Sequence, residues 1–87
     1  MKILIINWTD SCGEDGPFDK EETPELMTMI SAGILVRQNP EQITICQDFW
    51  SEQYGYRYRD VIVIPRKSII MTKEYKITYK FMENMDD

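Results

Sequence analysis

The chain has 87 residues, of which 43% are apolar, and its fifteen acidic and ten basic residues give a net charge of −5 without a single histidine. This length and composition predict one small folded domain rather than several domains or a disordered chain. The absence of histidine excludes Ser-His and Cys-His catalytic dyads and zinc sites that need histidine. No apolar stretch is long enough for a membrane span or a signal peptide, so a soluble cytoplasmic protein is expected.

The first predicted element is a strand over Lys2 to Trp8, a short run rich in Ile and Leu. It is followed by a long acidic loop from Asp10 to Leu26, in which glycine, proline and charged residues dominate. Within that loop Thr23 and Pro24 have the chemistry of a helix start, so one helical turn is expected there.

A hairpin is predicted from Met29 to Phe49. The segment Met29 to Arg37 is apolar, Ile43 to Phe49 alternates, and the letters QNPEQ between them supply turn residues. Proline fixes φ, and the asparagine before it accepts local backbone hydrogen bonds. Gly33 inside the first strand predicts a bend or a close backbone approach.

The last third of the chain predicts two more strands. Trp50 to Tyr58 is expected to form a long loop or a hairpin tip, and Arg59 to Ile64 a strand that Pro65 ends. A short helical turn is expected near residues 65–69, before a final strand over Ile70 to Tyr79.

Five short strands with no amphipathic helix predict an all-β fold, a small five-stranded barrel whose closure removes the sheet edges. The barrel domain is expected to cover residues 1–80, with residues 81–87 as a frayed acidic tail. The long acidic loop after the first strand matches the long first loop of an SH3-like barrel.

Several short motifs follow one another along the chain: WTDSCG and GPFD, then SAGILV, ITICQD and IPRKSII. This layout resembles small, largely uncharacterised phage and prophage proteins with an SH3-like β-barrel, over about Ile6 to Ile70. The position after the loop glycine departs from that pattern, because Pro17 and Phe18 stand where a tryptophan is usual. The resemblance implies an SH3-like fold, a phage-type origin and hence the host bacterial cytoplasm, and no defined activity.

Charge is unevenly distributed along the chain. Acidic residues dominate between Thr9 and Glu25, whereas basic residues dominate between Arg57 and Lys80. The two segments either form separate surfaces or neutralise each other, or they are ordinary solvated faces.

Catalysis is not expected. Cys12 lies in the acidic loop, where neighbouring carboxylates disfavour its thiolate, and the four glycines do not form a phosphate-binding loop. The loop also lacks calcium-loop spacing, because Cys12 stands at a ligand position. Neither a metal nor a cofactor is predicted.

The densest aromatic and cationic cluster is the candidate partner-binding site, because such residues are enriched at interaction hot spots. It comprises Trp50, Tyr54, Tyr56, Arg57, Tyr58 and Arg59. The competing interpretation is that these aromatics only cover the end of the barrel. Tyr56, beside Gly55, is the member expected to lie outside the core.

The leading hypothesis is a non-enzymatic phage or prophage accessory protein that acts by binding another protein, with a host protein as one candidate partner. A sharper version is an inhibitor of a host nucleic-acid enzyme, whose carboxylates replace phosphates in a basic groove. The acidic surface would comprise Asp10, Glu14, Asp15, Asp19, Glu21 and Glu22. One alternative is a module that binds single-stranded nucleic acid through the tyrosines and arginines, which the net charge disfavours. The other is a structural, self-assembling phage component.

Overall fold

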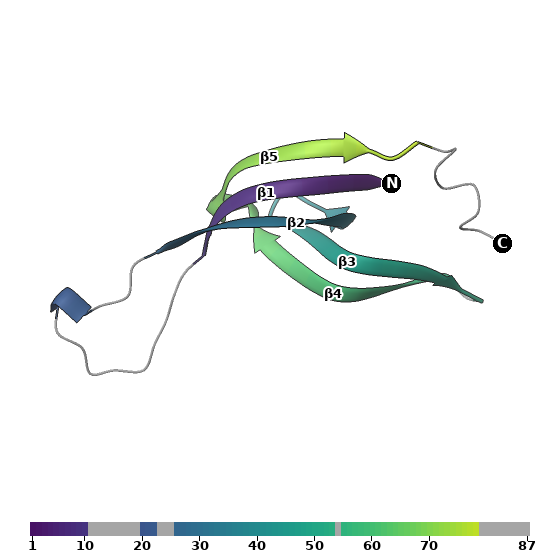
Figure 1. The fold of residues 1–87 in the computed structure, drawn as a ribbon, viewed down its shortest axis with the longest axis horizontal. Coiled ribbons are helices and arrows are strands. Elements are labelled where there is room, and N and C mark those ends of the chain that lie inside the picture. Colours follow the sequence, from purple (N-terminus) through teal and green to yellow (C-terminus); the bar gives the residue numbers. More distant parts are fainter. Residues whose placement is uncertain (11–19, 23–25, 54, 79–87) are drawn as a thin grey trace.

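The computed structural model describes residues 1–10, 20–22, 26–53 and 55–78 (Figure 1). In these residues the fold is all-β: five strands form one antiparallel sheet in the order β4-β3-β2-β1-β5. The strands are β1 (Lys2–Asp10), β2 (Met27–Gln38), β3 (Gln42–Glu52), β4 (Gly55–Pro65) and β5 (Ile69–Lys76). Two short 3₁₀ helices accompany them, η1 (Lys20–Glu22) and η2 (Arg66–Ser68).

Each of the five predicted strands is present, and the helical turn predicted near residues 65–69 is η2. Of the two predictions for Trp50 to Tyr58, the hairpin tip is confirmed and the long loop is wrong for most of that segment. β3 continues to Glu52, β4 begins at Gly55, and Trp50 pairs with Arg57 across the two strands. The ends of these strands were not recognised in the sequence because they carry charged and polar residues, and a strand exposed to water needs no apolar alternation.

The predicted closed barrel is not what the chain forms, because its single sheet stays open. β4 and β5 lie at opposite edges of the sheet and are joined only by the three residues of η2. Such a link spans about 10 Å at most, so it brings together only the end of β4 and the start of β5. Figure 1 shows the strands converging there and the β3–β4 hairpin diverging from β1 and β5 at the other end.

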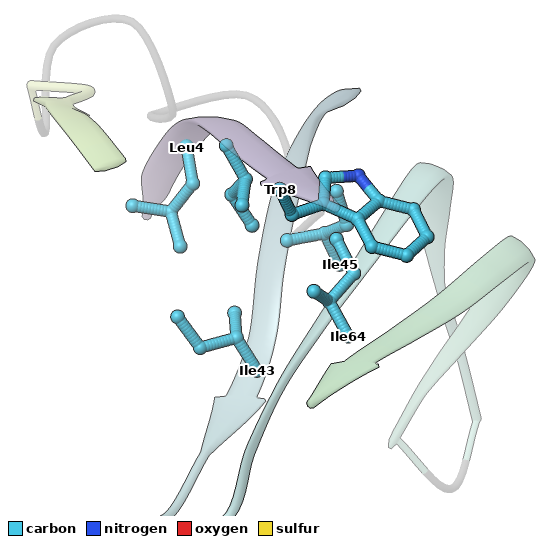
Figure 2. Close-up of a cluster of buried hydrophobic side chains, with 6 residues drawn as sticks. Leu4, Trp8, Ile43, Ile45 and Ile64 are labelled. Carbon is cyan, nitrogen blue, oxygen red and sulfur yellow. The ribbon is translucent and has the colours of Figure 1, made fainter. Parts of the chain in front are cut away.

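The core lies on one face of the sheet, between β1 and the β3–β4 pair (Figure 2). Leu4, Ile6 and Trp8 point the same way because side chains two apart along a strand share a face. Trp8 is buried in this core, and its indole N–H donates to the hydroxyl of Ser31 at 2.9 Å. Opposite them the buried isoleucines are Ile43, Ile45 and Ile64.

The hairpin between β2 and β3 follows the predicted turn chemistry. The side-chain Oδ1 of Asn39 accepts hydrogen bonds from the backbone N–H groups of Glu41 and Gln42, each at 2.9 Å. The close approach predicted at Gly33 is also present: a Cβ atom there would lie 2.8 Å from the carbonyl oxygen of Cys46. Glycine therefore lets the backbone of β3 approach β2 closely at this point.

Several sequence predictions fall on residues outside the described part of the chain. They are the acidic residues Glu14, Asp15 and Asp19, the thiol of Cys12, the helical turn at residues 23–25, the aromatic Tyr54 and the acidic tail 81–87. Among the described residues no helix has the length and apolar character that crossing a membrane requires.

Candidate interaction surface

The β3–β4 hairpin leaves the sheet as a two-stranded ribbon, which we define as residues Gln47 to Asp60. Pairing between β2 and β3 stops at Ile34 and Cys46, whereas β3 and β4 stay paired as far as Glu52 and Gly55. Gly55 at its tip has a φ of 125°, and Asp60 at its base a φ of 55°. The left-handed backbone at Asp60 interrupts β4 where the ribbon joins the sheet.

The register of the ribbon sorts the predicted site residues onto two faces. Phe49 pairs with Tyr58, and Ser51 with Tyr56, so the three aromatic side chains share one face. The Phe49 ring centroid lies 5.6 Å from that of Tyr56, edge to face, and 6.4 Å from that of Tyr58. Tyr56 and Tyr58 remain 46% and 43% exposed. We call Phe49, Tyr56 and Tyr58 the aromatic face.

The opposite face carries the arginines and Trp50. Asp48 pairs with Arg59 across the strands, and their side chains form an ion pair at 3.0 Å. Arg57 Nε donates to Glu52 at 3.1 Å, and the indole N–H of Trp50 donates to the other carboxylate oxygen of Glu52 at 3.0 Å. The predicted cluster is therefore divided: two tyrosines lie on one face, and Trp50 and both arginines on the other, the charged face.

A groove runs beside the aromatic face. It has a volume of about 190 Å³ and is lined by Met1, Ile34, Leu35, Phe49, Tyr56 and Tyr58. We call it the aromatic groove. Sequence analysis missed Phe49, Met1 and Leu35 as members, because residues from the start of β1 and the middle of β2 meet the ribbon only through the fold. The period-two spacing of Phe49 with Ile45 and Ile43 was the available signal.

A second hollow, of about 550 Å³, lies between the β2–β3 turn and η2, where Pro40, Val63, Pro65 and Lys67 are among its lining residues. Arg66 also lines it, but its guanidinium donates to the carbonyl of Asn39 and to the side chain of Gln38. This arginine therefore holds the turn against η2.

The acidic surface is only partly within the described chain. Asp10 ends β1, where it pairs with Met27 of β2, and Glu21 is exposed in η1. Glu22 also belongs to η1. Among the described residues, Arg57 and Arg59 form ion pairs with Glu52 and Asp48 inside the ribbon.

The described residues offer little catalytic chemistry. They contain no cluster of three cysteine or acidic side chains that would suit a metal ion. Cys46 is a buried free thiol, and burial, followed by the negative charge of Asp48, raises its pKa. A thiol that holds its proton this firmly is a poor nucleophile.

Comparison with known proteins adds no relative: no family model, no curated protein and no solved structure matches the chain.

Proposed function

We propose that this chain is a non-enzymatic accessory protein of phage or prophage type that acts by binding another protein through the aromatic face of the ribbon. The observation that carries the proposal is the grouping of Phe49, Tyr56 and Tyr58 beside an apolar groove, with both tyrosines nearly half exposed. Aromatic side chains supply large, stiff contact areas and dominate interface hot spots. An aromatic cluster needed only for the core would be covered.

The phage-type origin in this proposal rests on the sequence motifs alone, and the SH3-like part rests on the motifs together with the strand order. β1 lies between β2 and β5, residues 11–26 separate β1 from β2 in the sequence, and the short helix η2 precedes the last strand. These features fit an SH3-like sheet that has remained open on the side where the ribbon diverges. The open side leaves the aromatic groove accessible to a partner.

Binding of single-stranded nucleic acid is the weaker candidate, because the ribbon separates its tyrosines from its arginines. A stacking platform requires cations beside the rings to contact phosphates. Here Arg57 and Arg59 lie on the charged face, and each is paired with a carboxylate. We expect no binding of single-stranded oligonucleotides in fluorescence anisotropy, even at low salt, where phosphate contacts are strongest. A salt-sensitive rise in anisotropy would restore this candidate.

The acidic-inhibitor version of the proposal makes a separate prediction. Amide replacement of Asp10, Glu14, Asp15, Asp19, Glu21 and Glu22 should weaken binding to a basic partner, and added salt should weaken wild-type binding in the same way. If the amide variant binds as tightly as wild type, the partner is held by the aromatic face alone.

The central experiment is quantitative capture from a bacterial lysate with three forms of the protein: wild type, a double variant of the aromatic face (Y56A/Y58A) and a double variant of the charged face (R57Q/R59Q). The two variants alter opposite faces of one ribbon, so each controls for the other.

We expect wild type and R57Q/R59Q to recover the same protein, and Y56A/Y58A to recover at least about tenfold less, as loss of hot-spot aromatics does. Circular dichroism of each variant shows whether it is folded. Equal recovery by Y56A/Y58A, or no protein above background with wild type, would contradict the proposal.

A further inference from the structure

The hollow between the β2–β3 turn and η2 is a second concave site, separate from the aromatic groove. We call it the turn hollow. Its volume of about 550 Å³ lies within the roughly 300–1,000 Å³ of typical small-molecule pockets, whereas the aromatic groove is smaller. The two share no lining residue. On β4, Val63 of the turn hollow is an odd number of residues from Tyr58 of the groove, so these side chains lie on opposite faces.

Hydrogen bonds hold the walls of the turn hollow in place. The Oδ1 of Asn39 accepts from the backbone N–H groups of Glu41 and Gln42, each at 2.9 Å. The backbone N–H of Arg66 donates to the carbonyl of Glu41, also at 2.9 Å, and so ties η2 to the turn. The two prolines of the lining add fixed φ angles. The hollow is therefore formed without a ligand, which lowers the ordering cost of binding one.

Two cations and one carboxylate line the turn hollow. The guanidinium of Arg66 is oriented by its bonds to Asn39 and Gln38, which use one N–H of Nε and one of Nη2. An arginine has five such donors, so the others have no partner within the described chain. Lys67 is exposed and forms no ion pair with any described residue. With Glu41 as the single carboxylate, the lining carries an excess of one positive charge in a chain of net charge −5.

The rest of the lining is largely apolar and includes Pro40, Val63 and Pro65. Val63 is 50% exposed although it lies within β4, so an apolar group seated in the hollow would remove its side chain from water. A planar guanidinium matches a carboxylate, and its charge-assisted hydrogen bonds are the stronger kind. A dianionic phosphate matches less well, because its second charge exceeds the excess of the lining and is repelled by Glu41.

We propose that the turn hollow binds a small organic monocarboxylate, whose apolar body covers Val63 and the two prolines and whose carboxylate is held by Arg66 and Lys67. Arg66 then has two roles, because it joins the turn to η2 with some of its donors and binds the ligand with the others. This site goes beyond the proposed function, since it needs neither the aromatic face nor a partner protein.

The test is an NMR titration with three probes that share an indole ring: indole-3-acetate, its neutral amide indole-3-acetamide, and the cation tryptamine. We expect indole-3-acetate to shift the Val63 methyl and Arg66 Nε–H signals saturably, with a Kd of about 1 mM, which a ligand of this size can reach. The amide should bind at least about fivefold more weakly, because it lacks the charge-assisted hydrogen bonds. Tryptamine should bind more weakly still.

Three single variants keep the backbone hydrogen bonds of the turn and test the charges. K67Q should weaken binding of indole-3-acetate at least about threefold, because a cation of the site is lost. K76Q removes the last lysine of β5, whereas η2 precedes the first residue of that strand, so it should leave the Kd unchanged. E41Q should tighten binding about two- to threefold, because it removes the one repelling carboxylate.

Several outcomes would overturn the proposal. Equal or tighter binding of the amide or of tryptamine would show that the hollow does not select a carboxylate. Shifts that do not saturate, or that centre on the aromatic groove, would show that no such site exists. An unchanged Kd in K67Q, an equal loss in K76Q, or weaker binding in E41Q would each contradict the assigned charges. No partner protein enters the titration, so its failure leaves the proposed function intact, and failure of lysate capture leaves this site intact.

Discussion

Gly33 shows how one residue determines how closely two paired strands can approach. A Cβ atom there would lie 2.8 Å from the Cys46 carbonyl and 3.1 Å from the Cβ of Ile45, both of which the sheet holds in place. We therefore expect G33A to lower the free energy of unfolding by about 1–3 kcal/mol, as overpacking does. Urea denaturation measures it. Serine at the neighbouring exposed Ala32 is the control, and equal stability of G33A and wild type would contradict the close approach.

Thr44 is a buried polar residue that the sequence did not single out. It is 5% exposed, and its hydroxyl has no hydrogen-bond partner among the described residues. Valine has the same shape without the buried hydroxyl, so T44V should raise the free energy of unfolding, by up to about 1 kcal/mol. Thermal denaturation measures the change, with T44S as the matched variant that keeps the hydroxyl. A lower midpoint for T44V would show that the hydroxyl is satisfied.

The raised pKa of Cys46 gives stability a pH dependence of known sign. Burial and the charge of Asp48 make the folded thiol hold its proton more tightly than the unfolded thiol. Above about pH 8.5, the ordinary thiol pKa, the unfolded chain loses this proton while the folded chain retains it. The free energy of unfolding must then fall as pH rises.

We expect urea unfolding of wild type to show a steeper loss of stability than C46V between neutral and alkaline pH. The variant removes the titrating thiol, keeps a buried apolar side chain and leaves every other side chain of the protein the same. Parallel pH profiles would contradict the prediction.

At the scale of elements, the ribbon is the feature that most needed the structure. A two-stranded hairpin alone is only marginally stable in water, so the ribbon depends on its side chains. One face is joined by the Phe49 contacts with two tyrosines, the other by two exposed ion pairs. Exposed ion pairs contribute little, about 0–1 kcal/mol each, so the aromatic face provides most of the cross-strand stabilisation.

Because the aromatic face both stabilises the ribbon and forms the candidate site, substitution of Tyr56 tests whether this residue belongs to the candidate site or to the core. It is 46% exposed and packs edge to face on Phe49. We expect Y56A to cost about 0.5–1.5 kcal/mol, the value of one aromatic pair, and F49A to cost more, because Phe49 contacts both tyrosines. Thermal denaturation of both variants beside wild type decides the order. A loss of 3 kcal/mol or more in Y56A, typical of a truncated core aromatic, would remove Tyr56 from the candidate site.

Sequence reasoning identified the strands through local patterns and missed what depends on neighbours. The asparagine–proline turn, the apolar run of β1 and the glycine of β2 are local signals, and each was interpreted correctly. The extent of β3 and β4 is not local, because their exposed ends are paired only with each other. The candidate site was only partly predicted for the same reason. The composition indicated the aromatic cluster, but the pairing of β3 with β4 was needed to show that its arginines lie on the face opposite to Tyr56 and Tyr58.

At the scale of the whole molecule, the open sheet leaves the outer edges of β4 and β5 without a neighbouring strand in the described fold. A closed barrel was predicted because it has no such edges. The open sheet instead has features along its edges that obstruct pairing with another chain. The left-handed Asp60 interrupts β4, and β5 carries Lys73 and Lys76 among exposed residues. Lysine on an edge strand disfavours pairing with another chain, because it would bring a charge into the new interface.

These lysines lead to a prediction about association, which also addresses the self-assembly alternative. Ile70 and Met71, near the start of β5, are 58% and 67% exposed and would favour β5-to-β5 pairing, whereas the charges of Lys73 and Lys76 oppose it. We expect wild type to sediment as a monomer and K73V/K76V to form dimers or larger species at the same concentration. K73R/K76R keeps both charges and should sediment as wild type does. A wild-type oligomer in sedimentation would instead support the self-assembling component, and a monomeric K73V/K76V would show that the lysines do not protect the edge.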